Sequence, residues 1–375
     1  MKRIFSFIVI LTLALTAVGA CAAAETCAEE LPGLQYLYSM DRKYAEQFEV
    51  HYYEDGFKLL LIGDGNRYLL VPEGKEPPEK LDESIRVLQQ PLDSIYLAAT
   101  AAMSLFAAID SLDVITLTSL DAEEWYVEAA REAMEREEIF YGGKYSEPDY
   151  EALIELDADL TIENTMILHA PKVKEQIERL GIPVFVDRSS YEPHPLGRTE
   201  WMKLYGAMLN REAEAEAVFQ ERTAVMEDLK NFPDTGKTAA IFFIDSTGTV
   251  QVRSPSDYIS RILELAGGHN VFSSLELQEK SGNIRMTMEQ FYASARNADF
   301  LIYNSGSWGE GVDSMEKMLE KSPLLADFRA AEEGKVWWLG GETYQLADRL
   351  ADLVLDIHRM LIGAGDGMMF LHPME

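Results

Sequence analysis

The sequence is poor in cysteine: only Cys21 and Cys27 occur among its 375 residues. A disulfide scaffold, a thiolate metal site and a cysteine nucleophile are therefore excluded from the body of the chain after residue 27. Its stability has to come from a hydrophobic core, and the remaining chain is long enough for one large domain or two lobes.

Basic residues are also scarce, with 33 lysines and arginines against 64 aspartates and glutamates and a formal net charge of −31. The acidic residues are spread along the chain rather than gathered in one tail. Such a surface repels nucleic acid, so no nucleic-acid partner is expected. Most of the carboxylates are expected to serve solubility, and a few to dock onto arginines of a partner.

Long hydrophobic runs are absent apart from one, Ile4 to Ala20. This run follows Lys2 and Arg3 and ends in small residues, which is the layout of a secretory signal peptide. At about 17 residues it is short for a membrane span. Residues 1–20 are therefore predicted to be a signal peptide, and the mature protein to be exported.

The end of this segment, VGAC, allows two processing routes. It resembles a bacterial lipobox, in which Cys21 is acylated and becomes the first mature residue. Ordinary cleavage near Ala22–Ala24 is the alternative. We favour lipidation of Cys21, with residues 21–47 as a tether and the lipid as the only membrane contact. The predicted location is a cell-surface lipoprotein or the periplasm.

Two Asp-Gly pairs interrupt the β-favouring runs of residues 48–72. Asp-Gly supplies the positive φ values that tight hairpins need, so a three-stranded β-meander is predicted. A polar connector rich in proline and glutamate follows, and the two together occupy residues 48–84.

Short apolar strands then alternate with amphipathic helical stretches in residues 85–195, and the alternation restarts within residues 233–375. This pattern predicts an α/β fold with two Rossmann-like lobes and parallel sheets. Residues 196–232 contain no proline and carry apolar residues at helical spacing. They are predicted to form one long, fairly stiff α-helix between the lobes, about 45 Å in length for about 30 residues.

The leader, the two α/β lobes and the long helix resemble the helical-backbone solute-binding proteins of ABC importers, most closely the iron-siderophore and vitamin B12 branch. The resemblance covers roughly residues 85–365 and leaves the meander outside. It is carried by the order and spacing of YSEPDYEALIELDADLTIE (145–163), LGIPVFVD (180–187), HPLGRTEW (194–201), DYISRILELAGGHNVF (257–272) and TMEQFYASARNADFLIY (287–303).

This resemblance implies a monomeric receptor outside the cytoplasm. It would capture a ferric siderophore, a corrinoid or haem between its lobes and deliver it to a permease with its ATPase. No catalytic activity and no cofactor are implied, because the ligand itself is the metal chelate or metal macrocycle.

In the family that the chain resembles, each lobe carries a surface glutamate that pairs with arginines on the permease. The matched positions are Glu151 and Glu289, and Glu200 competes for the first role. One bidentate arginine–carboxylate pair per lobe would fix orientation as well as supply attraction. The alternative is that both are ordinary solvated carboxylates.

The loops after the expected strands are rich in aromatic residues and arginines. Aromatic side chains offer flat apolar area with a polar tip, and arginines neutralise catecholate, carboxylate or phosphate groups. The predicted ligand-binding residues are Tyr96, Tyr145, Met166, His169, Arg188, Tyr191, His194, Arg253, Tyr258, Trp308, Trp338 and Tyr344.

Three other classes of protein remain alternatives. A bare Zn²⁺ or Mn²⁺ receptor would use His169 and His194, but these are half a site at most, and no metal site is predicted. An extracellular hydrolase is disfavoured because GxSxG, HExxH and P-loop patterns are missing. An adhesive surface protein would owe its function to the β-meander predicted for residues 48–72.

His194 lies between Pro193 and Pro195, which restrict the backbone on both sides. The preferred interpretation is a rigid entry into the long helix. A ligand-facing imidazole comes second, and a dedicated metal cage last.

Overall fold

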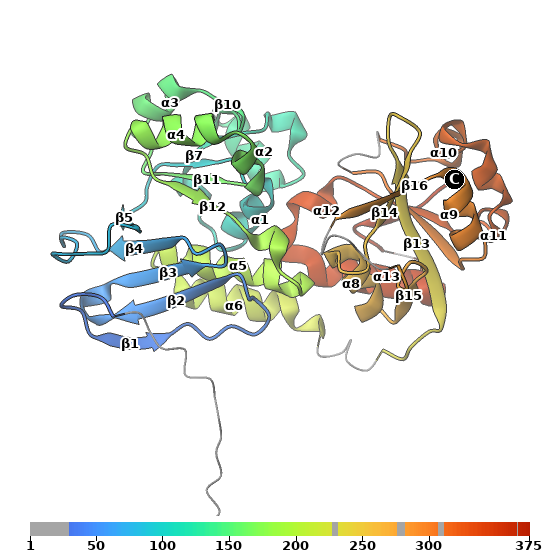
Figure 1. Ribbon diagram of the computed structural model, residues 1–375, viewed down its shortest axis with the longest axis horizontal. Coiled ribbons are helices and arrows are strands. Elements are labelled where there is room, and N and C mark those ends of the chain that lie inside the picture. Colours follow the sequence, from blue (N-terminus) through green and yellow to red (C-terminus); the bar gives the residue numbers. More distant parts are fainter. Residues whose placement is uncertain (1–29, 227–231, 276–281, 307–310, 366) are drawn as a thin grey trace, which may run out of the picture.

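The computed structural model describes residues 30–226, 232–275, 282–306, 311–365 and 367–375. The predicted signal peptide, Cys21, Trp308 and residues 227–231 of the expected long helix lie outside these ranges. The chain forms an N-terminal β-sheet with a first α/β unit beside it, and a second α/β lobe across the molecule (Figure 1). Within the described ranges, no helix is both long enough and apolar enough to cross a bilayer.

The N-terminal sheet has five strands in the order β1 (Tyr36–Ser39), β2 (Phe48–Tyr53), β3 (Lys58–Ile62), β4 (Arg67–Val71) and β5 (Ile85–Gln89). Strands β2 to β4 pair antiparallel and are the meander predicted for residues 48–72. Asp55 and Gly56 have φ values of 59° and 84°, the left-handed conformation that the first Asp-Gly turn requires.

Two strands extend this sheet beyond the prediction. β1 pairs antiparallel with β2, and β5 pairs parallel with β4. The predicted tether 21–47 is therefore wrong for its described part, because residues 36–39 are a strand of the fold. The boundary predicted at residue 85 is also wrong, since β5 belongs to the N-terminal sheet and completes its other edge.

The N-terminal sheet is not an independent domain. Its inward residues Phe48, Val50 and Leu60 share one hydrophobic core with Phe106 of the first α/β unit and Trp201. The rings of Phe48 and Trp201 are 5.4 Å apart at an angle of 76°, an edge-to-face contact. The sheet is thus fixed to the lobe by ordinary core packing.

The first α/β unit has a parallel sheet, as predicted. Its strand order is β12 (Val184–Val186), β11 (Leu160–Glu163), β6 (Ile95–Leu97), β7 (Ile115–Thr118) and β8 (Phe140–Tyr141). The connecting helices are α1 (Thr100–Ala108), α2 (Glu128–Glu135), α3 (Tyr150–Glu155) and α4 (Pro171–Arg179). A small hairpin, β9 (Gly143–Lys144) with β10 (Glu147–Pro148), precedes α3.

The predicted single long helix is two packed helices, α5 (Pro195–Met208) and α6 (Glu212–Thr223). The chain turns at Asn210, whose φ of 59° ends α5. Gly206 lets the helices approach closely, because a Cβ there would lie 2.6 Å from the Cβ of Ala215. All fourteen residues of α5 are buried, so this connection is part of the core rather than a free rod.

The second lobe has a mixed sheet in the order β16 (Asn283–Met286), β14 (Val250–Arg253), β13 (Lys237–Ile244), β17 (Phe300–Asn304), β18 (Val336–Leu339) and β19 (Leu371–Pro373), with β15 (Gly268–Asn270) beside β13. Its described helices are α8 (Tyr258–Leu265), α9 (Met288–Ala295), α10 (Met315–Lys321), α11 (Arg329–Glu332), α12 (Glu342–Gln345) and α13 (Leu350–Ile362). This sheet is mixed: β13 pairs parallel with β15 and β17 but antiparallel with β14. β13 and β14 are antiparallel because the tight turn between them can only form a hairpin.

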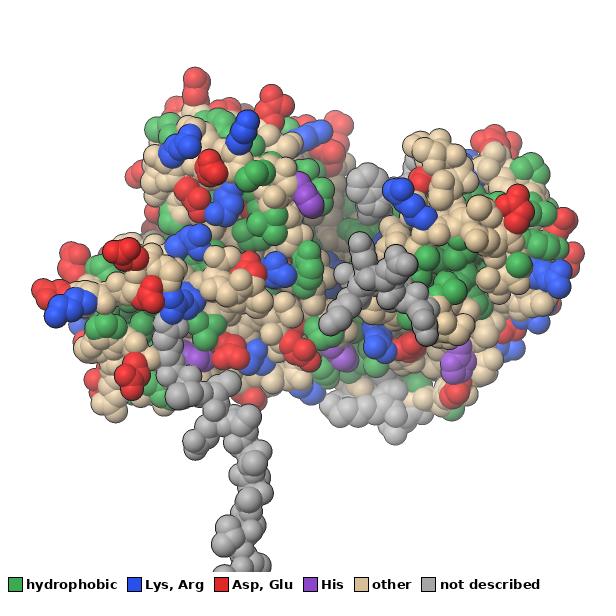
Figure 2. Space-filling view, viewed as in Figure 1, with side chains coloured by type: hydrophobic (Ala, Val, Ile, Leu, Met, Phe, Trp, Pro, Cys, Tyr) green, Lys and Arg blue, Asp and Glu red, His purple; other side chains and the backbone are tan. Residues whose placement is uncertain are grey.

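The two lobes touch directly at α12. The Gln345 side chain accepts a hydrogen bond from the Tyr126 backbone N–H at 2.7 Å and donates one to the Glu124 carbonyl at 2.9 Å. The Tyr126 ring lies against the backbone of Gly341. In α5, the Thr199 hydroxyl donates to the carbonyl of Ala347 at 2.7 Å. The space-filling view shows a hollow between the first α/β unit and the second lobe above this junction (Figure 2).

Candidate binding site between the lobes

A cavity of about 610 Å³ is lined by residues of both lobes. From the first lobe come Ser190 and Tyr191, in the short helix η5 (Ser189–Tyr191) after β12. From the second come Ser256 and Tyr258, before and at the start of α8. Two predicted ligand residues, Tyr191 and Tyr258, therefore line one cavity although 67 positions separate 191 from 258 in the sequence. Aromatic and hydroxyl groups from two sides suit a ligand with a flat apolar body and polar edges.

Arg253 and Tyr344, two further predicted residues, meet in a buried cluster beside Tyr258. The Tyr344 hydroxyl contacts the Arg253 guanidinium and lies 2.8 Å from the amide of Asn304. Asp257 lies 3.5 Å from Arg253 and caps α8 by accepting the Ile259 N–H at 3.0 Å. Because these groups satisfy one another, Arg253 supports the site and is not free to hold a ligand.

Tyr258 connects this cluster to α5. The Arg198 guanidinium lies over its ring, with Cζ 4.2 Å from the ring centroid. Burial raises the pKa of Tyr258 to about 12, although the charges of Arg198 and Arg253 act in the opposite direction. Its phenol is thus protonated at neutral pH and available as a donor.

Several predicted ligand residues lie elsewhere. Tyr96 is fully buried and donates to the Gly143 carbonyl at 2.8 Å, so its assignment to a ligand surface is wrong. Tyr145 packs against the same core, and Trp338 packs on His372 with ring centroids 4.5 Å apart. Arg188 lies over the Tyr191 ring at 4.2 Å and can orient it.

Met166 and His169 are exposed on the short helix η4 (Thr165–His169) after β11. Within the described ranges no group of three or more His, Cys, Asp or Glu side chains is placed to hold a metal ion. His169 and His194 are not brought together as ligands, so the geometry gives no support to the bare-metal alternative.

His194 is the N-cap of α5. Its Nδ1 accepts the Leu196 N–H at 3.1 Å, and its ring stacks on Tyr44 at 4.5 Å. Burial lowers the pKa of His194, while Glu200 acts in the opposite direction. The imidazole is therefore neutral at neutral pH, which the cap requires, and its capping nitrogen is not free for a ligand.

Glu200 cannot dock a permease, because it is fully buried. Its carboxylate accepts the backbone N–H groups of Lys43, Tyr44 and Ala45 at 2.7, 2.7 and 2.8 Å. Glu192 continues the pattern and accepts the N–H groups of residues 46 and 47 at 2.7 and 3.0 Å. Two carboxylates thus hold five consecutive backbone N–H groups and fix the chain that leads into β2.

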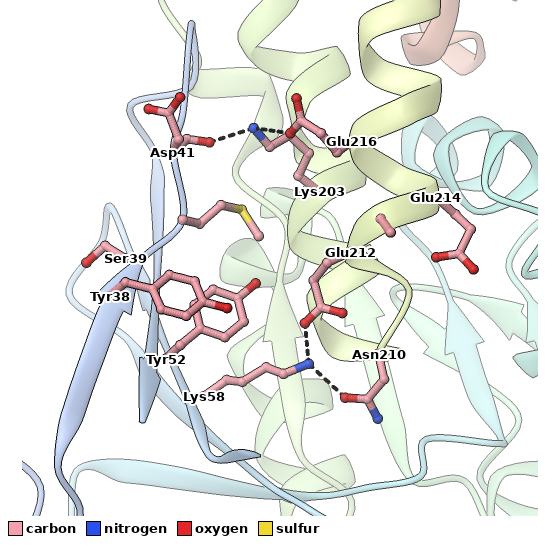
Figure 3. Close-up of a pocket in the computed structure, with 12 residues that line it drawn as sticks. Tyr38, Ser39, Asp41, Tyr52, Lys58, Lys203, Asn210, Glu212, Glu214 and Glu216 are labelled. Carbon is pink, nitrogen blue, oxygen red and sulfur yellow. Dashed lines mark hydrogen bonds and ion pairs between the residues drawn. The ribbon is translucent and has the colours of Figure 1, made fainter. Parts of the chain in front are cut away.

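A second cavity, of about 800 Å³, lies between the N-terminal sheet and the turn from α5 to α6 (Figure 3). Tyr38 and Tyr52 stack at 4.6 Å on one side of it. The Lys58 ammonium bonds the Ala207 carbonyl at 2.8 Å, the Asn210 side chain at 2.7 Å and Glu212 at 2.5 Å. Lys203 is paired with Glu216 at 2.8 Å. Because the ammonium groups of Lys58 and Lys203 already have acceptors, we interpret the residues around this cavity as a polar interface that fixes the N-terminal sheet to α5 and α6.

The sequence prediction missed Arg198, Asn304 and Glu163. Arg198 lies in the HPLGRTEW segment, but an arginine near the start of an expected surface helix is predicted to be solvated.

Glu163 is the last residue of β11 and is 0 % exposed, and neither of its carboxylate oxygens has a hydrogen-bond partner among the described residues. Burial raises the pKa of Glu163 to about 8. No local pattern distinguishes it from the other acidic residues.

Glu151 and Glu289 are exposed, and they occupy equivalent positions in the two lobes. Each is the second residue of its helix, after the capping side chains of Asp149 in α3 and Thr287 in α9 (Figure 1). Hydrogen bonds from its own turn and from Thr287 hold the pKa of Glu289 below its usual range. Both lobes thus present a solvent-facing carboxylate in the first turn of the helix before a central strand.

Two α/β lobes border one cavity that is lined by aromatic residues, and a pair of packed helices connects them. This architecture defines the class of two-lobed binding proteins. Residues 106–343 match the family described as periplasmic binding protein. This is more than half of the chain, so the protein belongs to that family, whose members are solute-binding proteins of ABC importers rather than enzymes. Family membership places the protein outside the cytoplasm.

The chain is also similar in sequence to known relatives and in fold to solved structures. An uncharacterized lipoprotein of Methanocaldococcus jannaschii is 23% identical over 349 residues, which cover 85% of this chain and 81% of the relative. The fold is similar to a periplasmic heme binding protein from Pseudomonas aeruginosa, with a TM-score of 0.59, 17% identity and coverage of 76% and 98% of the two chains. It is also similar to the periplasmic vitamin B12 binding protein of Vibrio cholerae, with a TM-score of 0.52, 16% identity and coverage of 74% and 99%.

Proposed function

We propose that the protein is the receptor of an ABC importer for an iron chelate, a corrinoid or haem, held between its two lobes. The observation that carries this proposal is the cavity of about 610 Å³ to which both lobes contribute a tyrosine, Tyr191 and Tyr258. Flat aromatic rings with polar tips match the chelates and macrocycles named for the structurally similar proteins.

Titration of the mature protein tests this proposal through quenching of its intrinsic tryptophan and tyrosine fluorescence. The probes are a ferric hydroxamate, a ferric catecholate, cyanocobalamin and haemin, with Zn²⁺ and Mn²⁺ in parallel. Saturable submicromolar binding of one chelate or macrocycle is expected. Binding of the bare ions alone would favour a metal-ion receptor instead, and turnover of model esters or glycosides would favour the hydrolase alternative.

We further propose that Glu151 and Glu289 dock the permease. Their equivalent positions and exposure support pairing with one arginine group per lobe. The double variant Glu151→Ala/Glu289→Ala should lower ligand uptake by about tenfold or more while ligand affinity stays unchanged. A matched control replaces two other exposed glutamates, Glu155 and Glu316. Equal uptake by both double variants would remove the two carboxylates from the interface.

The lipid anchor at Cys21 is also a proposal, supported by the lipoprotein names of two relatives. Replacing Cys21 by alanine should release the protein from membranes into the soluble fraction. Retention of the variant in the membrane fraction would contradict lipidation at this residue.

A further inference from the structure

Arg198 lies at the junction of the two lobes and is nearly buried. It belongs to the first turns of α5, with 6 % of its surface exposed, and its guanidinium carbon lies over the Tyr258 ring at the start of α8, 4.2 Å from the ring centroid. The contact therefore joins the connecting helix to the second lobe. Contact with an aromatic ring supplies no oxygen acceptor, so the N–H donors of the guanidinium remain to be satisfied.

No acceptor satisfies that edge in the part of the chain that the structure describes. The Nε atom of Arg198 is buried without a hydrogen-bond partner, and no ion pair of its guanidinium occurs among the described residues. The buried hydroxyl of Tyr258 is likewise without a partner. A buried charge without a counter-charge is costly, and such charges are normally paired.

The carboxylates around this junction are already engaged or exposed. Asp257 lies 3.5 Å from Arg253 and caps α8, so its carboxylate is used by Arg253 and by the helix N-terminus. Glu192, which lines the cavity, is held by the N–H groups of residues 46 and 47 and by Trp201 at 2.8 Å. Glu46 also lines the cavity but is exposed to solvent. In a protein with a net charge of −31, an unpaired buried arginine is therefore a local exception.

The cavity between the lobes lies next to this pair, because Tyr258, whose ring carries Arg198, lines it together with the hydroxyl residues Ser190 and Ser256. Arg198 itself lies behind the Tyr258 ring and is not a lining residue of that cavity. A carboxylate, catecholate or phosphate that enters beside this ring would find a guanidinium and a phenol donor, the groups that form charge-assisted hydrogen bonds with anions.

We propose that Arg198 and Tyr258 form an anion-recognition subsite, and that the transported ligand is an anionic chelate or an anionic macrocycle. The inference rests on the proposed receptor function and narrows its ligand class. A ferric tris-catecholate, a ferric polycarboxylate or haem fits this subsite. Neutral cyanocobalamin and a cationic ferric hydroxamate do not.

Calorimetric titration of wild-type and variant proteins tests the subsite. The probes are a ferric tris-catecholate, ferric citrate, haemin, cyanocobalamin and a cationic ferric hydroxamate. Wild type should bind an anionic probe most tightly, and Arg198→Gln should weaken that binding by about ten- to a hundredfold. The matched control Arg136→Gln, which removes an exposed guanidinium bonded to Glu138, should leave affinity unchanged.

Thermal melting without ligand separates recognition from a structural role. Because Arg198→Gln removes an unpaired buried charge, its melting temperature should equal or exceed that of wild type. Should this variant fail to fold, Arg198→Lys keeps the charge but loses the planar edge, and it should still bind the anionic probe more weakly. Wild-type affinity in Arg198→Lys would then overturn the subsite.

Two further outcomes would contradict the account in different ways. If a neutral or cationic probe binds best and Arg198→Gln does not change its affinity, the receptor function stands and the anion subsite is wrong. If none of the five probes binds, the proposed function itself fails, and the subsite fails with it.

Discussion

At the scale of single residues, burial rather than residue type decides what each charged group does. Glu200 lies in a segment whose sequence predicts an exposed helix face, yet its buried carboxylate accepts hydrogen bonds from three backbone N–H groups. The sequence predicted that Tyr191 and Tyr258 face a ligand, because aromatics after strands are visible in the pattern. It could not predict the roles of Arg198 or Glu200, because their burial depends on the N-terminal sheet and on α8.

Glu163 provides a pH-dependent test at this scale. Its pKa is raised from 4.5 to about 8 by burial, so the folded protein keeps the proton where the unfolded chain releases it. The contribution of this carboxyl group to the free energy of unfolding is therefore fully present below pH 4.5. It declines as the pH rises from 4.5 to about 8, and above that pH it no longer changes.

Replacing Glu163 by glutamine should remove this decline and stabilise the protein at pH 8 by on the order of 2–4 kcal/mol. Urea denaturation of wild type and variant between pH 5 and pH 9 measures the difference, with exposed Glu155→Gln as control. A difference that does not change with pH would mean that Glu163 is ionised in the folded protein.

At the scale of elements, most strands and helices follow the hydrophobic pattern, whereas their ends and partners do not. The meander and the parallel sheet of the first lobe were predictable from Asp-Gly turns and βα alternation. The break between α5 and α6 was not, because apolar residues continue at helical spacing across Asn210. Only the left-handed conformation of Asn210 and the close packing at Gly206 reveal the turn.

Gly206 tests the packing of the two helices. In an isolated helix, alanine is favoured over glycine by about 1 kcal/mol. Here the new Cβ would lie 2.6 Å from Ala215, so Gly206→Ala should destabilise the protein by about 1–3 kcal/mol in urea denaturation. The exposed Ala217→Gly in α6 gives the pure propensity cost for comparison. A more stable Gly206→Ala protein would show that α6 does not pack on α5 in this way.

At the scale of the whole molecule, the connecting helices and the N-terminal sheet form one body with the first lobe. α5 also contacts α8 and α13 of the second lobe, and Gln345 bonds the first lobe at two points. Such a junction resists the wide hinge closure of binding proteins that are joined by flexible strands.

The lobes should therefore rotate by only about a few degrees when ligand binds. Structures of the free and the loaded protein, superposed on the first lobe, measure this angle. A rotation above roughly 20° would mean that the α12 junction opens and that the connection is a hinge.

Hydrogen–deuterium exchange of the mature protein, with and without its tightest-binding probe, shows whether one ligand is held by both lobes at once. A ligand held in this way should protect residues 189–191 in the first lobe and residues 256–261 in the second. Protection confined to one lobe, or to residues 38–41 and 212–216 around the second cavity, would contradict it.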